Sequence, residues 1–221
     1  MPMQAPFSCL PATIDSIEMA LSPARFGRYV AMAQGDRARA FRLYHWNALL
    51  SASLYWPMQI MEVAFRNAIV TVLRNRYGAG WHVEPRLLRC LDAPDHNKLN
   101  EAVNRHAGSG MPVDAVVADI TFGFWVALLA RRYEVPLGWP KRLPVAFPQL
   151  PPGLSREDVR RRANEIRILR NRIAHHEPIL HRRLQDDYYA ILDVIGWCSI
   201  DLRWVVERTA DVLPLFRNPP S

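Results

Sequence analysis

Asn171 and His175 lie four residues apart in the segment Arg170-Asn171-Arg172-Ile173-Ala174-His175. On an α-helix this spacing places both on one face, and Arg172, three residues before His175, lies on the other side of the histidine. Cleavage of RNA without a metal needs a base for the 2′-hydroxyl proton, an acid for the leaving 5′-oxygen and a cation for the charge on the phosphorane. Histidine can act as acid or base near neutrality, and the arginine fork matches phosphate oxygens. These residue types therefore suit chemistry on a phosphodiester.

The spacing of Arg170 and His175 limits what one copy of the segment can do. They are five residues apart, which is roughly 140° around a helix at about 100° per residue. Arg170 can meet a substrate held by His175 through its long side chain, through a distorted last turn, or from a second copy of the chain. An arginine-rich helix also produces this pattern by chance, so a solvated basic face with a capping histidine is about equally compatible with it.

Three nearby histidines, His175, His176 and His181, raise the question of a metal site with Glu177. Adjacent histidines point to different sides of a helix, and Pro178 interrupts the chain before His181. We therefore expect no metal. The chain contains neither a Gly-x-x-x-x-Gly-Lys-Ser/Thr loop nor a Gly-x-Gly-x-x-Gly motif after a strand, so we also expect no nucleotide cofactor.

Basic charge is concentrated beside the motif. The chain of 221 residues has a net charge of +7, and seven arginines lie between Ser155 and Arg172 against only Glu157, Asp158 and Glu165. This density favours a polyanionic partner such as RNA. Within it, the run Arg160 to Arg162 suits either phosphate binding or a solvated face.

Other features exclude whole classes of protein. Cys9, Cys90 and Cys198 lie far apart and form no Cys-x-x-Cys pair, which argues against a disulfide framework or a structural zinc site and favours a reducing cytoplasm. Residues 1–11 lack the pattern of a signal peptide. The longest apolar run, residues 120–130, is about half of what a bilayer span needs. We expect a cytoplasmic protein with no membrane association.

The periodicity of apolar residues predicts an all-α protein that forms one domain over residues 1–221. The expected helices run from Ser22-Pro23 to about Gly35, from Arg37 through a kink or new start at Pro57 to Arg76, from Asp95 to His106, from Val113 to Arg132, from Ser155 to about His176, and from His181 to Thr209. Gly78 and Gly80 are expected to end the second of these, and Ser155 with Asp158 has the spacing of a capping box.

The remaining segments are expected to be irregular. Six prolines between residues 136 and 153 predict an extended connection, and residues 1–20 and 216–221 are expected to be flexible. Two groups of aromatic residues are expected to pack in the interior rather than stack on bases. They are Phe122, Phe124 and Trp125 in one segment, and Tyr44 with Trp46, beside His45, in the other.

Three stretches of the chain together carry a family resemblance. The string Leu169-Arg170-Asn171-Arg172-Ile173-Ala174-His175-His176-Glu177-Pro178-Ile179 resembles the motif of the abortive-infection (Abi-like) family within the HEPN superfamily. Glu62-Val63-Ala64-Phe65-Arg66-Asn67-Ala68-Ile69, followed by Tyr77-Gly78 and Trp81, and Thr121-Phe122-Gly123-Phe124-Trp125 resemble two further signatures of that family. Together they cover the chain from about Ala24 to Ile195 in the family's order.

The resemblance implies an HEPN-like helical bundle with additional N-terminal helices, and a homodimer that brings two motifs together. It further implies a metal-independent endoribonuclease that serves as a toxin or in phage defence, with an antitoxin or regulatory protein as a further partner. Arg170 and His175 would be the catalytic pair and Asn171 their polar companion. Arg172 and His176 would be secondary, substrate-binding candidates.

The Glu62 stretch suggests further site residues. Glu62 and Arg66 are spaced for an ion pair within one helix, and the alternative is that they buttress the site or contact RNA. Asn67 is expected to cap or bridge helices, with buttressing of the site or contact with RNA as the alternative.

Two other functions remain compatible with the sequence. One is a non-catalytic HEPN-type module that binds RNA or protein through its basic helix, with a binding strength that falls with salt. The other is a structural or regulatory helical protein whose arginines only solvate it.

Overall fold

The computed structural model describes residues 11–110, 112–217 and 220, and within these ranges the protein has thirteen α-helices and no strands, which confirms the all-α prediction. The helices are α1 (Pro11–Leu21), α2 (Pro23–Met32), α3 (Arg37–Tyr77), α4 (Pro85–Leu88), α5 (Ala93–Arg105), α6 (Val113–Asp119), α7 (Phe122–Ala127), α8 (Glu134–Leu137), α9 (Trp139–Ala146), α10 (Arg156–Ala174), α11 (Leu184–Cys198), α12 (Ile200–Thr209) and α13 (Leu213–Phe216). None of the described helices is long and apolar enough to cross a membrane.

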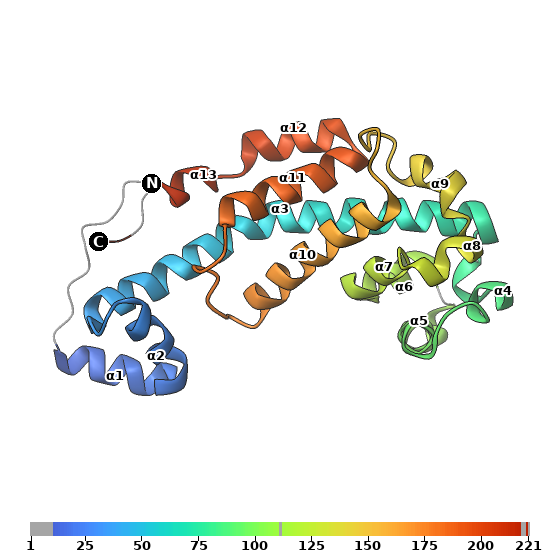
Figure 1. Ribbon diagram of the computed structural model, residues 1–221. Coiled ribbons are helices and arrows are strands. Elements are labelled where there is room, and N and C mark those ends of the chain that lie inside the picture. The colour runs from blue at the N-terminus through green and yellow to red at the C-terminus, as the bar shows by residue number, and fades with distance from the viewer. Residues whose placement is uncertain (1–10, 111, 218–219, 221) are drawn as a thin grey trace.

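The long helix α3 runs through nearly the whole molecule (Figure 1). It begins at Asp36, whose side chain accepts a hydrogen bond from the Arg39 N–H, and ends at Gly78, which adopts a positive φ of 88°. Pro57 was expected to kink this helix or to start another. The first alternative agrees with the structure, because the chain stays helical for 41 residues with Pro57 inside, and in Figure 1 the first half of α3 slopes relative to the second. A missing N–H at one position bends a helix without ending it when its neighbours are packed on both sides.

Helices α11 and α12 pack along α3, and α10 packs against α11 and α7. Helices α4 to α9 gather at one end of α3, and α1 and α2 at the other (Figure 1). The main core lies between the second half of α3 and helices α7, α9, α10 and α11. Phe122 is 2% exposed and Phe124 and Trp125 are 0% exposed, which confirms that they are core residues. A second, smaller core joins α1, α2 and the first turns of α3.

Two segments expected to be single helices are each divided. The apolar segment 113–132 contains α6 and α7, separated by Ile120 and Thr121 in extended conformation, with ψ of 129° and 150°. The segment 181–209 contains α11 and α12, separated by Ser199, whose side chain accepts a hydrogen bond from the Leu202 N–H. These single residues leave the apolar pattern unbroken, so the periodicity gave no sign of either break.

The proline-rich segment 136–153 is not an extended connection, because it contains the second half of α8 and all of α9. Pro140 lies in the first turn of α9, where the missing N–H costs no helical hydrogen bond. Trp139 is 1% exposed and donates from Nε1 to the Leu128 carbonyl at 2.8 Å. Leu137, Trp139, Ala146 and Phe147 are buried and anchor this segment in the core.

The ends of the chain differ from expectation in one respect. Residues 11–21 form α1 rather than a flexible tail, and residues 1–10, with Cys9, lie outside the described residues, as do 218, 219 and 221. Ser22 precedes α2 as predicted, but its side chain makes no capping hydrogen bond. Cys90 and Cys198 are free thiols.

Candidate active site

The start of α10 confirms the predicted capping box. The Ser155 hydroxyl accepts from the Asp158 N–H at 3.3 Å, and the Asp158 carboxylate accepts from the Ser155 N–H at 2.9 Å. These bonds satisfy two N–H groups that would otherwise lack partners. From this start, α10 packs its apolar face against α7 and α11, which sets the direction in which the motif at its other end emerges.

The end of α10 is a Schellman motif built on the two histidines. His175 is the C-cap residue, the His176 N–H donates to the Ile173 carbonyl at 3.0 Å, and the Glu177 N–H donates to the Arg172 carbonyl at 2.8 Å. His176 occupies the position usually taken by glycine and adopts a positive φ of 54°. The chain therefore turns away from the helix directly after His175, and the side chains of both histidines are exposed.

Three side chains hold the segment that follows the motif. Asn47 of α3, only 5% exposed, accepts from the Ile179 N–H at 2.8 Å, and its amide faces the Glu177 carbonyl at 3.5 Å. Arg172 donates to the Pro178 carbonyl at 3.2 Å and lies 3.4 Å from the Glu177 carboxylate. Arg25 of α2 donates to the His176 carbonyl at 3.0 Å. Arg172, predicted to bind substrate, is engaged in holding this segment.

Arg170 is tied to α3 by an ion pair. Its Nε lies 3.5 Å from the Glu62 carboxylate, and the two side chains are 43% and 25% exposed. The expected pair between Glu62 and Arg66 within α3 is therefore wrong, because among the described residues Glu62 pairs across helices with the motif. Arg66 is half-buried one turn away, and its Nε is buried without a hydrogen-bond partner among the described residues. Buttressing of the motif, the other role considered for Glu62, agrees with this contact.

The remaining predicted residues lie around this pair. Asn171 is half-buried, and its backbone carbonyl accepts from the His175 N–H at 2.9 Å. Because α10 stays helical through Ala174, the five-residue offset between Arg170 and His175 is kept. Asn67 has an exposed side chain, and its backbone carbonyl accepts a hydrogen bond from the Thr71 hydroxyl at 2.9 Å.

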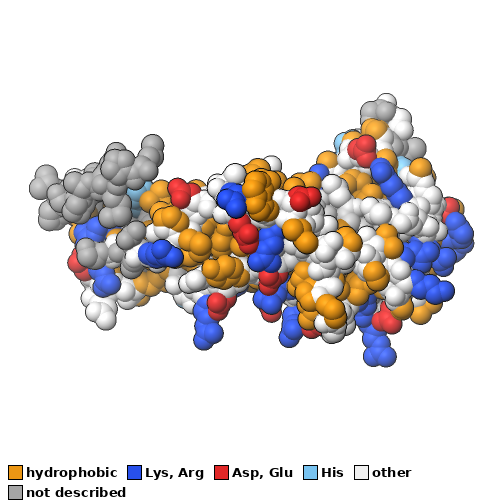
Figure 2. All heavy atoms as spheres, turned by 90° about the horizontal axis from the view of Figure 1, so that it is seen from above, with side chains coloured by type: hydrophobic (Ala, Val, Ile, Leu, Met, Phe, Trp, Pro, Cys, Tyr) orange, Lys and Arg blue, Asp and Glu red, His pale blue; other side chains and the backbone are white. Residues whose placement is uncertain are grey.

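Part of the basic run on α10 is neutralised locally. Arg160 pairs with Glu157 at 2.5 Å and Arg161 with Asp158 at 3.0 Å. These two arginines therefore agree better with a solvated helix face than with a phosphate-binding site. On the face that Figure 2 shows, basic side chains are spread along the molecule, several of them beside acidic ones.

The described residues include no group of three or more His, Cys, Asp or Glu side chains that could hold a metal ion. Comparisons of the chain with protein-family models, with curated protein sequences and with solved structures found no match. The assignment of a function therefore depends on the chemistry of the site itself.

Sequence reasoning did not single out two residues that shape the site. Asn47 is a buried polar residue in an apolar stretch of α3, and such a residue signals a specific hydrogen-bonded role whose partner only the fold reveals. Arg25 has no sequence feature that distinguishes it from other surface arginines. Of the three residues interpreted as packing, Trp46 is half-buried and donates to the Leu215 carbonyl at 3.3 Å, His45 is exposed, and Tyr44 lines a surface cleft described below.

Proposed function

We propose that this protein is a metal-independent endoribonuclease of the abortive-infection, HEPN type, with a composite Arg170 and His175 site at a homodimer interface. The observation that carries the proposal is the end of α10, where Arg170 is held by Glu62 of α3 and His175 is exposed at the point where the helix stops. The motif is thus ordered by its surroundings yet open to a large substrate.

The proposed reaction uses the motif of two protomers. One His175 takes the proton of a ribose 2′-hydroxyl, and the 2′-oxygen attacks phosphorus to form a new P–O bond. The P–O5′ bond then breaks, and the partner subunit's His175 donates a proton to the 5′-oxygen. Arg170 stabilises the charge on the phosphorane, and Asn171 orients the histidine or donates to phosphate. The products are a 2′,3′-cyclic phosphate and a 5′-hydroxyl.

The decisive experiment compares the purified full-length protein with variants on total RNA in EDTA. The parent should cut RNA, and Arg170→Ala and His175→Ala should each lower the rate at least about 100-fold, the range expected for loss of acid–base or charge-stabilising groups. His45→Ala removes another exposed histidine and should leave the rate unchanged. Circular dichroism confirms that the variants are folded, and a folded His175→Ala protein that cuts like the parent would refute the catalytic assignment.

A second candidate function is a non-catalytic module of the same type that binds RNA or a protein through its basic helix. It is favoured by the engagement of both motif arginines within the protomer, Arg170 by Glu62 and Arg172 by the segment after the motif. This function predicts binding that weakens with added salt and no cleavage at any protein concentration.

A further inference from the structure

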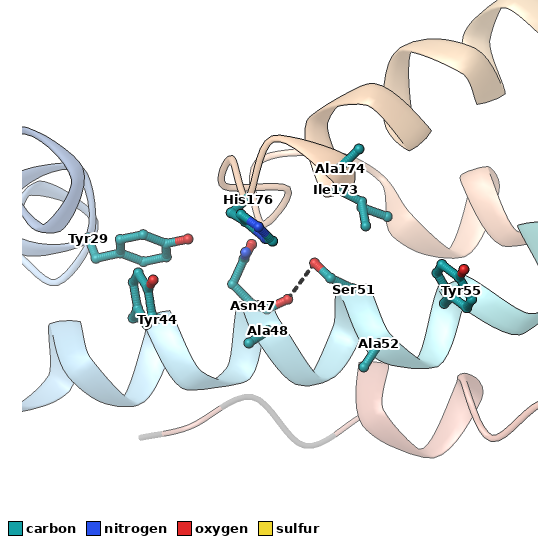
Figure 3. Close-up of a pocket in the computed structure, with 10 residues that line it drawn as sticks. All are labelled: Tyr29, Tyr44, Asn47, Ala48, Ser51, Ala52, Tyr55, Ile173, Ala174 and His176. Atoms are coloured by element: carbon teal, nitrogen blue, oxygen red, sulfur yellow. Dashed lines mark hydrogen bonds between the residues drawn. The ribbon is translucent and has the colours of Figure 1, made fainter. Parts of the chain in front are cut away.

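A surface cleft lies directly beside the candidate site. It has a volume of about 570 Å³ and lies between α2, the first half of α3 and the end of α10 (Figure 3). His176, the residue that follows the candidate catalytic His175, forms part of its wall. The volume is in the range of about 300 to 1,000 Å³ that is usual for sites that bind small ligands.

The floor of the cleft is a stripe of small side chains on α3, bracketed by two tyrosines. Ala48, Ser51 and Ala52 lie between Tyr44 and Tyr55, at spacings that place all five near one face of the helix. The tyrosines are eleven positions apart, which at 1.5 Å per residue is about 16 Å along the helix. The cleft is hollow because the side chains between the rings are short.

The walls of the cleft are mostly apolar, and tyrosine rings form much of them. Tyr29 packs edge-on against Tyr44 with ring centroids 5.0 Å apart, and in Figure 3 its hydroxyl points towards Asn47 and His176. Burial, with the neighbouring Tyr44, raises the pKa of Tyr29 to about 12, so this hydroxyl stays protonated and can donate a hydrogen bond. Tyr55 is 65% exposed, so its ring is available to a ligand. Flat aromatic faces of this kind stack on nucleobases with little dependence on sequence.

Positive charge at the cleft favours a nucleic acid over an apolar peptide. Arg25 reaches the edge of the cleft, where it donates to the His176 carbonyl at 3.0 Å, and Arg28 lies close enough to Tyr29 to oppose the rise in its pKa. A strand that places a phosphate at the motif would bring the attached bases within reach of the rings, with its backbone near these arginines.

We propose that this tyrosine cleft binds a nucleobase of the RNA strand next to the scissile phosphate, by stacking on Tyr55. The inference rests on RNA being the substrate of the proposed ribonuclease, and it assigns the cleft a separate role, that of holding a base. Because the recognition is by stacking, the cleft accepts every base and favours single-stranded RNA, whose bases are free to leave the strand.

The test measures binding of a short fluorescent single-stranded RNA to the full-length His175→Ala protein by anisotropy. In this background Tyr55→Ala should weaken binding about tenfold, within the range expected for loss of one stacked base. Tyr55→Phe keeps the ring and should bind within about twofold of the background. Tyr189→Ala removes a tyrosine on α11 that is 43% exposed and lies outside the cleft, and it should have no effect.

A matched oligonucleotide with abasic sites separates the bases from the phosphates. It should bind more weakly, and Tyr55→Ala should then cause no further loss. Equal affinity of Tyr55→Ala and its background for the base-containing RNA would overturn the proposal. So would a change in oligomeric state of Tyr55→Ala, measured by light scattering, with unchanged RNA affinity, because the cleft would then be a protein contact.

The outcomes distinguish this inference from the proposed function. If the parent cuts RNA and Tyr55→Ala cuts and binds it equally well, the base-binding role fails while the ribonuclease stands. If base-dependent binding requires Tyr55 but the parent cuts nothing in EDTA, the ribonuclease fails and the cleft stands. If no RNA binds at all, both are wrong.

Discussion

The charge next to Arg170 decides how this side chain acts. Glu62 lies 3.5 Å from its Nε, and both side chains are partly exposed, so the pair contributes little to stability. Its main effect is on position, because a long arginine side chain otherwise samples many rotamers. We therefore regard Glu62 as a positioning residue for the proposed reaction.

Glu62→Gln removes this charge but keeps the shape of the side chain. We expect kcat for RNA cleavage to fall by a factor of about 1.4 to 5, which corresponds to the roughly 0.2 to 1 kcal/mol typical of exposed ion pairs. KM should not rise, since loss of a negative charge does not weaken the attraction of phosphate. Steady-state kinetics on a defined RNA would separate the two constants.

The control for this variant is Glu101→Gln, an exposed glutamate on α5 away from the motif. In an Arg170→Ala background Glu62→Gln should have no additional effect on kcat, because its target is gone. Independent, additive effects of the two substitutions would show that Glu62 does not act through Arg170.

At the scale of elements, the turn that ends α10 contains a residue of an unfavourable type. His176 has a φ of 54° at the position where glycine is preferred, and a side chain there costs roughly 1 to 2 kcal/mol. Arg25 and Arg172 donate hydrogen bonds to the His176 and Pro178 carbonyls, and Asn47 accepts one from the Ile179 N–H, which together hold the turn in place. Such a conformation at a candidate site is consistent with a functional use of the imidazole.

His176→Gly should therefore stabilise the protein. We expect the free energy of unfolding to rise by about 0.5 to 1 kcal/mol, since relief of the strain exceeds the added entropy of glycine in the unfolded chain. Urea denaturation followed by circular dichroism measures this change. His176→Ala removes the imidazole but keeps the Cβ, so it should not stabilise. A gain of the same size in both variants would mean that the imidazole, not the backbone, is the source of the strain.

The elements that sequence reasoning predicted are those with local signals. The helices α3 and α10 begin at Asp36 and Ser155, whose side chains bond to N–H groups three residues away, and α3 ends at Gly78. Such signals require only neighbouring residues. The breaks at Thr121 and Ser199 depend instead on how apolar side chains on both sides of the break pack in the core. For the same reason the prolines of α8 and α9 were misleading, because tertiary packing overrode their local preference.

The same distinction applies to the candidate site. The placement of Arg170, Asn171 and His175 along one helix could be predicted from the sequence, because it depends only on neighbouring residues. The contacts of Glu62 with Arg170 and of Asn47 with Ile179 join residues more than 100 positions apart, and no spacing rule connects them. The cleft was missed because Tyr44 was interpreted as a packing residue without its distant neighbours on α2 and α10.

At the scale of the whole molecule, the proposed reaction takes its base and its acid, two copies of His175, from two protomers. An Arg170→Ala/His175→Ala protein should therefore inactivate any parent protomer with which it dimerises. When the two are co-expressed and purified together in equal amounts, activity per parent protomer should fall to about half. With a tenfold excess of the variant it should fall to about a tenth, the fraction of parent protomers that find a parent partner in a two-fold dimer.

Co-expression with the same excess of His45→Ala, which leaves the motif intact, should cause no loss. If activity per parent protomer stays constant as the double variant is added, each protomer carries a complete site and the composite arrangement is wrong. RNA cleavage in EDTA is the readout, with protomer ratios measured by mass spectrometry.

The two anchors of the segment after the motif differ in kind. Asn47 holds Ile179 from within the core, whereas Arg25 holds the His176 carbonyl at an exposed contact where water competes for the same groups. The segment is therefore firmly anchored at Ile179 and more weakly held at His176. Because His176 also lines the tyrosine cleft, any movement of this residue changes both the width of the cleft and the position of the neighbouring His175.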